Sequence, residues 1–558
     1  MIISDDQLKS LVLKTKLIDE KGLEKIIEYG KNTGVSLAEA LSENNLVSDE
    51  NLGMLIADYL KLPFISLSKT TITPEVFRIV PERVARKHKV IAFTRSPEGI
   101  KVAMADPRNI ELLQLLSKKT GTRLFPYLAT TRDINNTFQI YRKDLQKSFA
   151  ELIQKETHGN STEEAPITKI VDLLISYAYQ DKASDIHIEP QEKSSLIRFR
   201  IDGILHDVLS LPKDLHERIL SRIKVLSRLR TDEHLSAQDG KMRIQLEEEN
   251  LDIRVSIIPI ADGEKVVMRL LSSKSRQYTL IDLGMRQQDL DKVSKAFNRS
   301  FGMILSTGPT GSGKSTSIYS ILKIINTREK NITTIEDPVE YKIKGVNQIQ
   351  VNIKTNLTFA NGLRSVLRQD PNIIFVGEIR DIETAGIAVN AALTGHLVLS
   401  TLHTNDAATA LPRLSDMKVE PFLVASTVNI IIAQRLVRKI CDMCKTSVDI
   451  DASTLTKHLS LETVNKHFGQ KKQLRIYKGT GCKICHFTGY SGRVGLFEVL
   501  EVSNGIRKLI TEKADSDVIG KQALADGMTS MLDDGLEKVI KGVTSIEEVL
   551  RVTKVESA

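Results

Sequence analysis

Apolar residues recur at intervals of three and four along the first 62 residues of the chain. This spacing places them on one face of a helix and therefore predicts short amphipathic helices. Four segments show the pattern, at residues 7–13, 20–29, 37–43 and 49–60. Pro63 ends this helical unit, since proline lacks the N–H donor that a helix interior requires.

From residue 63 to about 142, strand-like segments alternate with helix-like ones, which predicts a small α/β unit. Residues 100–104 are one such strand, and residues 109–116 are one such helix. The chain then becomes polar and rich in turn-forming residues between positions 143 and 165, so we expect a linker there.

A second α/β unit is predicted for residues 166–275. Its expected elements are a helix at 167–180 and strands at 183–190, 196–203 and 252–256. The two-residue period of a strand puts Asp185, His187 and Glu189 on one face. Three such side chains could bind a metal, but we interpret them as a polar structural or interdomain surface.

The last part of the chain, residues 276–558, again has strand and helix patterns. An apolar segment at 303–307 precedes a glycine-rich turn and a helix-forming run at 317–325. Further expected elements are strands at 331–337, 372–378, 394–403 and 492–498 and a helix at 430–439. The whole is typical of an α/β domain with a central sheet.

The first strand, turn and helix of this part carry a phosphate-binding motif. Residues 308–315 fit G-x-x-x-x-G-K-[ST], in which glycines let backbone N–H groups turn toward phosphate oxygens. Lys314 would reach the β- and γ-phosphates of ATP, and the Ser315 hydroxyl would bind Mg²⁺. The flanking strand and helix disfavour the alternative of a glycine turn without a ligand. The predicted nucleotide-binding residues are Gly308, Pro309, Thr310, Gly311, Ser312, Gly313, Lys314, Ser315 and Thr316.

Acidic residues follow two of the predicted strands. Glu336, Asp337 and Glu340 come at the end of one, and ligands of an open α/β sheet bind beyond the carboxyl ends of its strands. One of these three carboxylates could take the proton of an attacking water. Glu378 ends another strand in the manner of a Walker B segment and would bind Mg²⁺, although Gly377 stands where aspartate is common.

Two histidines, His396 and His403, bracket the apolar part of the strand predicted at 394–403. A single histidine is more often structural. Because a phosphate loop belongs to the same sheet, we predict that both histidines sense the γ-phosphate.

The four cysteines form two C-x-x-C pairs, Cys441 with Cys444 and Cys482 with Cys485, separated by a polar insert. Four thiolates close a tetrahedral site, so this spacing predicts structural zinc. Residues 482–486 also fit the haem-attachment pattern C-x-x-C-H, but haem would leave the other pair unused. We therefore predict a zinc module at residues 441–485.

Composition narrows the class of protein. With 558 residues, 41% hydrophobic and 27% charged, the chain is typical of a soluble protein of several domains. The net charge of +8 weakly favours anionic partners such as nucleotides or an acidic membrane surface. No apolar run approaches the ~20 residues of a membrane span, and the first residues lack the features of a signal peptide. We expect a cytoplasmic protein, peripheral at the inner face of the cytoplasmic membrane.

Several segments together resemble the signature boxes of the secretion ATPases that assemble type IV pili and drive type II secretion. The segments are residues 183–190, 308–316, 335–340, 367–371, 376–381 and 394–403. The resemblance covers residues 166–558 closely and 1–140 loosely. It implies a homohexameric ring that hydrolyses ATP and acts on an inner-membrane platform protein.

The same resemblance assigns roles to the candidate residues. It makes Glu340 the catalytic base, Glu378 the Walker B acid, and His396 and His403 the histidine box.

Arginines of the preceding domain also reach the phosphates in this family. Arg254 and Arg269 match two of these positions. Lys241 stands where a third arginine is usual, and lysine lacks the bidentate fork of a guanidinium.

The N-terminal region resembles the domain that docks such motors onto membrane-bound partner proteins. Some relatives bind cyclic di-GMP there through repeated Arg-Leu-Gly motifs. This chain has Gln-Leu-Lys at 7–9 and Ser-Leu-Ala at 36–38 instead. Because the arginines are absent, we predict docking without cyclic di-GMP.

Together these observations predict an α/β multidomain protein. The expected order is a helical docking subdomain (1–62), a small α/β subdomain (63–142), a linker (143–165), a PAS-like α/β domain (166–275) and a RecA-like P-loop ATPase domain (276–558) with a zinc module and a helical tail. The implied cofactors are ATP, Mg²⁺ and zinc.

Two other functions remain to be weighed against a secretion motor. A nucleic-acid translocase shares the RecA-like fold, but tryptophan is absent and aromatic residues make up 5% of the chain, which disfavours a nucleic-acid partner. A scaffold that binds nucleotide without turnover would not need the full set of Lys314, Ser315, Glu340 and Glu378.

Overall fold

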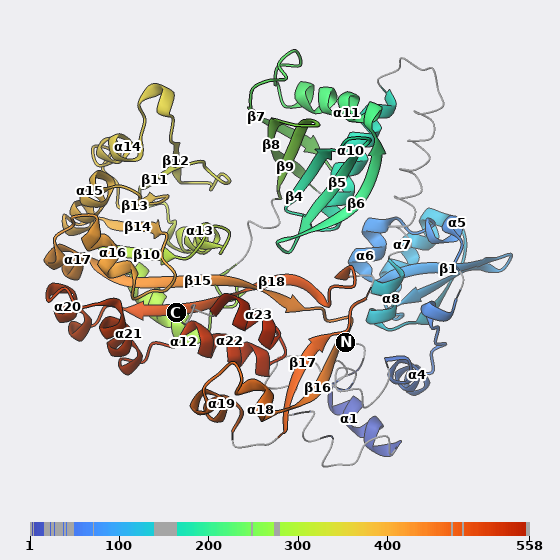
Figure 1. Ribbon diagram of the computed structural model, residues 1–558. Coiled ribbons are helices and arrows are strands. Elements are labelled where there is room, and N and C mark those ends of the chain that lie inside the picture. The colour runs from blue at the N-terminus through green and yellow to red at the C-terminus, as the bar shows by residue number, and fades with distance from the viewer. Residues whose placement is uncertain are drawn as a thin grey trace.

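The computed structural model describes residues 5–15, 49–70, 72–138, 165–246, 249–272, 279–469, 473–482 and 485–553, and the single positions 3, 23, 27, 37 and 41. Figure 1 shows three parts in chain order: a blue N-terminal part, a green middle domain and a yellow-to-red C-terminal domain. Each part has its own sheet and its own buried apolar cluster. The linker predicted at 143–165 lies outside the described residues, apart from Ala165.

In the N-terminal part, helices accompany a three-stranded sheet of order β1–β2–β3, in which β2 is antiparallel to β1 and parallel to β3. The elements are α1 (Asp5–Lys14), α4 (Asp49–Leu60), η1 (Leu67–Lys69), α5 (Pro74–Phe77), α6 (Glu82–His88), β1 (Val90–Ser96), β2 (Gly99–Met104), α7 (Ile110–Thr120), β3 (Leu124–Leu128) and α8 (Thr131–Thr137). The helices predicted at 7–13, 49–60 and 109–116 and the strand at 100–104 are confirmed. The helices predicted at 20–29 and 37–43 lie outside the described residues, except for four single positions that are helical.

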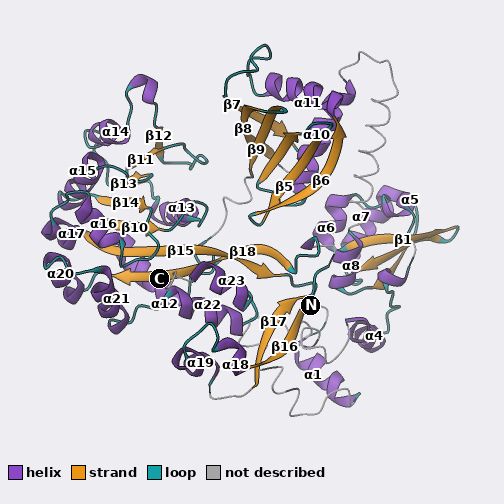
Figure 2. Ribbon diagram, viewed as in Figure 1, coloured by secondary structure: helices purple, strands orange, loops and turns teal. Residues whose placement is uncertain are grey.

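The middle domain is built on six antiparallel strands in the order β6–β5–β4–β9–β8–β7 (Figure 2). Its elements are α10 (Ala165–Gln180), β4 (Asp185–Pro190), β5 (Ser194–Ile201), β6 (Ile204–Pro212), α11 (Lys213–Leu226), β7 (Gln238–Gln245), β8 (Asn250–Ile260) and β9 (Gly263–Leu271). Alternate strand residues such as Ile186, Phe199 and Met268 pack with α10 and α11 into one apolar cluster. The opposite face of the sheet keeps the polar residues, as the sequence predicts.

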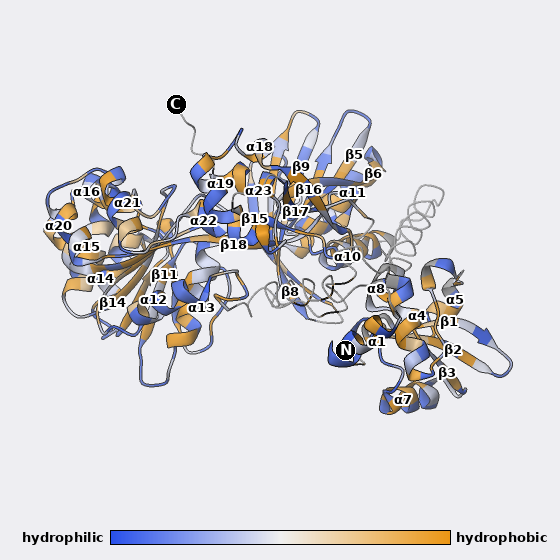
Figure 3. Ribbon diagram, turned by 90° about the horizontal axis from the view of Figure 1, so that it is seen from below, coloured by the Kyte–Doolittle hydropathy of each residue, from blue (hydrophilic) through white to orange (hydrophobic). Residues whose placement is uncertain are grey.

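The C-terminal domain contains a seven-stranded sheet of order β12–β11–β13–β14–β10–β15–β18. Its strands are parallel except β18, which runs antiparallel to β15. Helices α12 and α13 cover one face, and α14 to α17 with the last helices of the chain cover the other. Figure 3 shows the strands between these layers in the hydrophobic colour.

Among the elements of this domain, the strands and the first helix that the sequence predicted agree closely with the structure, with one exception described below, whereas α12, β12, η3 and α14 to α17 were not predicted individually. The elements are α12 (Gln287–Phe297), β10 (Gly302–Thr307), α13 (Lys314–Ile325), β11 (Ile332–Glu336), β12 (Asn347–Gln350), η3 (Ile353–Thr355), α14 (Phe359–Val366), β13 (Ile373–Val376), α15 (Ile382–Leu393), β14 (Leu397–Leu402), α16 (Ala410–Asp416), α17 (Pro421–Thr427), β15 (Val428–Ile440) and β18 (Tyr490–Glu501).

The helix predicted at residues 430–439 is wrong, because this segment belongs to the strand β15. β15 pairs with β10 on one side and with β18 on the other. Ile430, Ile431 and Ile432 are fully buried, because helices cover both faces of the sheet at this point. A continuous apolar run fits a buried strand and a buried helix equally well, so its period could not decide between them.

β15 and β18 are 13 and 12 residues long and extend beyond the sheet. β10 pairs with β15 as far as Ala433, whereas β18 pairs with it as far as Ile440. The two strands therefore leave the sheet as a ribbon, which Figure 1 shows running toward the centre of the molecule. The insert at the end of the ribbon consists of β16 (Lys445–Asp451), α18 (Ala452–Leu455), α19 (Leu461–Phe468) and β17 (Gln473–Gly479).

A buried charge network ties the last helices, α20 (Asn504–Thr511), α21 (Ser516–Ala525), α22 (Met531–Ile540) and α23 (Ile546–Thr553), to the rest of the domain. Asp534 on α22 accepts a 2.8 Å hydrogen bond from the N–H of Phe497 on β18 and lies 2.5 Å from Nζ of Lys538. Arg286, which precedes α12, lies 3.7 Å from the same carboxylate and 2.8 Å from that of Asp289. The network joins the first helix of the domain to its helical tail.

Removal of Lys538 should destabilise the C-terminal domain, because Asp534 would remain buried with less compensating charge. We expect Lys538→Ala to lower the free energy of unfolding by about 3 kcal/mol, a typical effect of breaking a buried ion pair. The control is Lys508→Ala, since the Lys508–Glu512 pair is exposed and should contribute less than about 1 kcal/mol. Thermal unfolding measures both, and equal shifts in Tm would contradict the prediction.

Candidate nucleotide and metal sites

The predicted phosphate loop connects β10 to α13 at the carboxyl edge of the sheet. The nine residues 308–316 lie in this loop or in the first turn of α13. Gly308, Gly311 and Gly313 have φ values of +144°, +79° and +91°, which residues with side chains rarely adopt. The loop can therefore turn its N–H groups, together with the positive end of α13, toward an anion.

Gln434 on β15 packs against this loop. A Cβ atom at Gly308 would lie 2.4 Å from the carbonyl oxygen of Gln434, and one at Gly313 would lie 2.7 Å from its side-chain nitrogen. Ser317 on α13 donates a 2.6 Å hydrogen bond to Oε1 of Gln434. Sequence analysis did not identify Gln434, because its segment was predicted to be a helix.

Lys314 lies inside the loop and is 8% exposed. Its Nζ donates hydrogen bonds to the carbonyl oxygens of Gly308 at 2.7 Å and Pro309 at 3.1 Å. Burial lowers the pKa of Lys314, and the nearby carboxylate of Glu378 opposes this shift. Ser315, the next residue, is exposed at the start of the helix.

Glu336 and Glu340 occupy different environments, although Glu336 is the last residue of β11 and Glu340 lies four residues after it. Glu336 is 3% exposed and accepts hydrogen bonds from the side chains of Tyr319, Thr334 and Gln348. Burial raises the pKa of Glu336 in spite of these bonds. Glu340 has a side chain that is 39% exposed, and its backbone N–H donates to the Tyr319 hydroxyl at 3.3 Å. Glu340 is therefore the more accessible carboxylate, and Tyr319 joins the two positions.

Glu378 follows β13 and reaches the same edge of the sheet. Its carboxylate lies 2.7 Å from Nε of Arg380 and 3.2 Å from Nε2 of His403. β14 pairs with both β10 and β13, so the ends of three strands bring the phosphate loop, Glu378 and His403 together. Arg380 was not predicted as a site residue, although it belongs to the segment 376–381.

The structure separates the two predicted histidines. His396 precedes β14 and His403 follows it, so six residues of strand, about 20 Å, lie between them. Nδ1 of His396 lies 2.9 Å from the carbonyl oxygen of Ala391. The prediction that His396 lies beside the phosphate loop is therefore corrected: it stands at the amino edge of the sheet.

The polar face of the middle-domain sheet carries a row of cations. Strand register places Lys241 beside Arg254, and Arg254 beside Arg269. Nε of Arg269 lies 2.9 Å from Oδ1 of Asp185 on the neighbouring strand. Lys241, at the end of the row opposite to Arg269, is exposed.

Arg254 links this row to the C-terminal domain. Its Nη2 donates a 2.7 Å hydrogen bond to the carbonyl oxygen of Val339. Its Nη1 lies 3.1 Å from Oε2 of Glu340. A cation of one domain therefore neutralises the accessible carboxylate of the next.

The four cysteines come together where the β15–β18 ribbon meets the insert, and their sulfur atoms lie within 4.8 Å of one another. The Sγ atoms of Cys441 and Cys482 are 3.8 Å apart, as are those of Cys444 and Cys485, and Cys482 and Cys485 are separated by 3.7 Å. Zinc with four bonds of about 2.3 Å needs edges of about 3.8 Å, whereas a disulfide needs about 2.0 Å. The cluster fits zinc, and its use of both pairs disfavours haem attachment.

The thiols differ in how readily they ionise. Burial raises the pKa of Cys441, and burial raises the pKa of Cys444 to about 11. Burial also opposes ionisation of Cys485, but hydrogen bonds from the N–H groups of Cys482 and Gly489 outweigh it and lower its pKa. A zinc ion would favour the thiolate form of all four side chains.

Comparison with known protein families agrees with this arrangement. A profile of the family described as type II/IV secretion system protein matches residues 160–551. The chain belongs to this family. A second profile, the MshEN domain, matches residues 60–146.

Relatives of this secretion system protein match over most of its length. It is 37% identical to the type IV pilus assembly ATPase PilB of Myxococcus xanthus over an alignment of 567 residues that covers 98% of each chain. It is 45% identical to the type II secretion system ATPase E of Vibrio cholerae over 406 residues, 72% of this chain and 78% of the relative. The X-ray structure of the Legionella pneumophila ATPase DotB has the same fold, with a TM-score of 0.51 and 22% identity, covering 68% of this chain and 94% of DotB.

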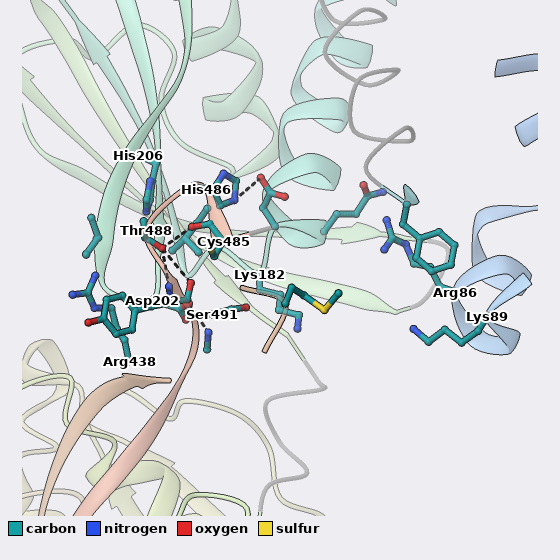
Figure 4. Close-up of a pocket in the computed structure, with 18 residues that line it drawn as sticks. Arg86, Lys89, Lys182, Asp202, His206, Arg438, Cys485, His486, Thr488 and Ser491 are labelled. Atoms are coloured by element: carbon teal, nitrogen blue, oxygen red, sulfur yellow. Dashed lines mark hydrogen bonds and ion pairs between the residues drawn. The ribbon is translucent and has the colours of Figure 1, made fainter. Parts of the chain in front are cut away.

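A cavity of about 330 Å³ lies where the three parts of this secretion system protein meet (Figure 4). Arg86 and Lys89 line it from the N-terminal part, and His206 lines it from β6 of the middle domain. His486, which follows the last cysteine, completes the wall, with its ring centre 5.5 Å from that of His206. The cysteine cluster is thus part of a junction between domains.

Two polar contacts hold the cysteine cluster against the middle domain. Nε2 of His486 lies 3.8 Å from Oδ2 of Asp181, which follows α10. The N–H of Gly492 on β18 donates a 2.6 Å hydrogen bond to the carboxylate of Asp202, in the turn between β5 and β6. This second link between the domains was not predicted from the sequence.

Metal analysis of the purified protein should find about one zinc per chain and no haem absorbance. Cys482→Ser leaves three thiolates and a weaker site, so zinc content should fall and proteolytic nicking between Cys444 and Cys482 should rise. Nucleotide binding should persist, because the ribbon separates the cysteines from the phosphate loop. Thr446→Ser on β16 is the control. Metal-free wild-type protein with a disulfide would contradict the prediction.

Proposed function

We propose that this protein is a motor ATPase that hydrolyses ATP to drive assembly of a type IV pilus or of a type II secretion pseudopilus. The observation that carries the proposal is the convergence of the phosphate loop, Glu340, Glu378 and His403 at one edge of the sheet, with Arg254 reaching in from the middle domain. The relatives PilB and secretion ATPase E support the same function. The family match also favours a secretion motor over a nucleic-acid translocase.

The phosphate loop and Glu378 would bind the nucleotide and its metal. Lys314 would exchange its two carbonyl acceptors in the loop for oxygens of the β- and γ-phosphates. Ser315 and Glu378 would hold Mg²⁺, which neutralises charge that develops on the phosphates during transfer. His403, in contact with Glu378, is placed to respond to the terminal phosphate.

Glu340 would act as the general base that takes a proton from the attacking water. It is partly exposed, whereas Glu336 is buried and already accepts three side-chain hydrogen bonds. The Tyr319 hydroxyl, held by Glu336, positions the backbone of Glu340. If Glu336 is not the base, the remaining candidates are Glu340 and the exposed Asp337. Of these two, Arg254 contacts Glu340.

Arg254 would couple the chemistry to domain movement. It bonds both to Val339 and to Glu340, so a change at this carboxylate alters the attachment of the middle domain. Interfaces held by a few polar contacts allow domains to move relative to each other. Such movement within a homohexamer is the means by which the motor would act on its platform protein.

The N-terminal part would dock the motor to a membrane-bound partner at the inner face of the cytoplasmic membrane. Its match to the MshEN domain is consistent with a docking role. That this region docks without binding cyclic di-GMP stays a prediction. In the part of the chain that the structure describes, no helix has the length and apolar character needed to cross a bilayer.

Lys314→Ala should abolish most ATP turnover, because the ammonium neutralises phosphate charge that grows during transfer. The measurement is phosphate release by the purified protein. Lys323→Ala, near the end of the same helix α13, is the matched control and should retain activity. Retained turnover in Lys314→Ala with an unchanged fold would contradict the proposed ATPase site.

Glu340→Gln should keep ATP binding and slow hydrolysis by about 10²–10⁴-fold, the usual contribution of a general base. Asp337→Asn removes the same charge from the same loop and should have a much smaller effect on kcat. Single-turnover kinetics with both variants separate the two residues. Loss of ATP binding in Glu340→Gln would point instead to a role in holding the nucleotide or its metal.

A further inference from the structure

The polar face of the middle-domain sheet contains more charged residues than the two arginines assigned to the nucleotide. Strand register places Asp185 of β4 beside Arg269 of β9 on one side and beside Arg200 of β5 on the other. The row that begins with Lys241 and Arg254 therefore continues across the sheet. Asp185 is the carboxylate in this row, and it lies between the cations Arg269 and Arg200.

His187 lies two residues along β4 on the same face, between Asp185 and Glu189. Its side chain is buried, and neither ring nitrogen has a hydrogen-bond partner among the described residues. Oε1 of Glu189 lies 3.8 Å from Nδ1 of His187, beyond hydrogen-bond distance. Buried polar groups without partners are rare in proteins, so each one in a native structure calls for an explanation.

Six charged side chains face His187. Asp185 and Glu189 come from its own strand, and the others are Arg198 and Arg200 on β5 and Lys265 and Arg269 on β9. Four cations and two carboxylates give the cluster a net charge of +2. Burial lowers the pKa of His187, and Arg200 and Lys265 lower it further against the opposing effect of Asp185 and Glu189, which favours the neutral ring.

Arg269 is the member of this cluster that can leave. Its side chain is 60% exposed, and its Nε–Oδ1 ion pair with Asp185 is its recorded contact among the described residues. Its neighbour across the strands, Arg254, already touches the catalytic loop at Val339 and Glu340. A guanidinium can exchange a carboxylate for a phosphate without changing its hydrogen-bonding geometry.

We propose that nucleotide binding moves Arg269 from Asp185 to the phosphates, and that His187 then takes up a proton from solvent. This inference rests on the proposed ATPase function. Departure of Arg269 lowers the charge of the cluster from +2 to +1, and protonation of one ring nitrogen of His187 restores it to +2. The resulting imidazolium lies between the carboxylates of Asp185 and Glu189. Asp185 and His187 are positioning residues. Asp185 binds Arg269 in the nucleotide-free state, and His187 supplies a positive charge after Arg269 has left.

The pH dependence follows from the direction of this proton movement. His187 binds its proton more tightly in the nucleotide complex than in the free protein. The additional affinity is therefore fully present below the pKa of the free protein, and it is lost as the pH rises through the pKa of the complex. Release of the nucleotide returns Arg269 to Asp185 and the proton to solvent.

Isothermal titration calorimetry of the full-length protein tests the inference, with the Mg²⁺ complex of a non-hydrolysable ATP analogue as the ligand. Titrations near neutral pH in two buffers of different ionisation enthalpy give the number of protons taken up per nucleotide. Wild-type protein should take up a measurable fraction of a proton more than His187→Asn does. His206→Asn, which alters a histidine at the domain junction, is the control and should match the wild type. Protonation of the analogue itself is common to all variants.

Three outcomes decide the matter. Equal proton uptake by wild type, His187→Asn and His187→Gln, with the fold of each confirmed by circular dichroism, would overturn the inference. Undiminished uptake by Arg269→Gln would overturn the part assigned to that arginine. If the wild type does not bind the analogue at all, the proposed function fails together with this inference, whereas binding without His187-dependent uptake refutes the inference alone.

Discussion

The hydrogen-bonded ladder between β15 and β18 joins the nucleotide site to the cysteine cluster, and the other sites depend on it. At one end, β15 pairs with β10 and places Gln434 against the glycines of the phosphate loop. At the other end, its last residue, Ile440, precedes Cys441, and Gly492 of β18 binds the middle domain. A paired ribbon transmits a displacement along its length better than a loop does, because every residue pair resists bending. A zinc ion would fix the far end of this ribbon.

The middle domain is attached to the C-terminal domain by polar contacts at two separate places. One is the bond from Arg254 to Val339 and Glu340, and the other is the pair of contacts made by Gly492 and His486. Charged and hydrogen-bonded contacts can exchange partners with water or phosphate at modest cost, whereas a large apolar interface would hold the domains in one arrangement. The first contact lies at the site of the chemistry, while the second lies at the end of the ribbon.

Local chemistry made part of this structure predictable from sequence. The strand, glycine turn and helix around Lys314 follow from apolar runs and the special conformations of glycine, and the cysteine spacing specifies four ligands for one metal. Register and strand order are non-local, so they were not predicted. The segment 430–439 was misassigned because burial on both faces removes any period from an apolar strand. His396 was placed at the site for a related reason, since sequence proximity to His403 conceals that a six-residue strand carries them to opposite edges. The surroundings of the His187 ring nitrogens include four charged neighbours from two other strands, β5 and β9, and no sequence pattern reports them.

The register of the middle-domain sheet also shows how the surroundings of Lys241 differ from those of Arg254 and Arg269. Arg254 makes two bonds to two different acceptors, so it needs the rigid fork of a guanidinium. Arg269 pairs with a carboxylate that a lysine could also neutralise, but its exchange onto phosphate benefits from the same fork. Lys241 stands at the exposed end of the row, beside Arg254, and no partner is recorded for it among the described residues. A point charge is enough where the requirement is positive potential near an anion rather than a fixed pair of hydrogen bonds. The two arginines therefore use the planar guanidinium for paired hydrogen bonds, whereas Lys241 would contribute positive charge alone. All three side chains lie on the same cationic face of the sheet.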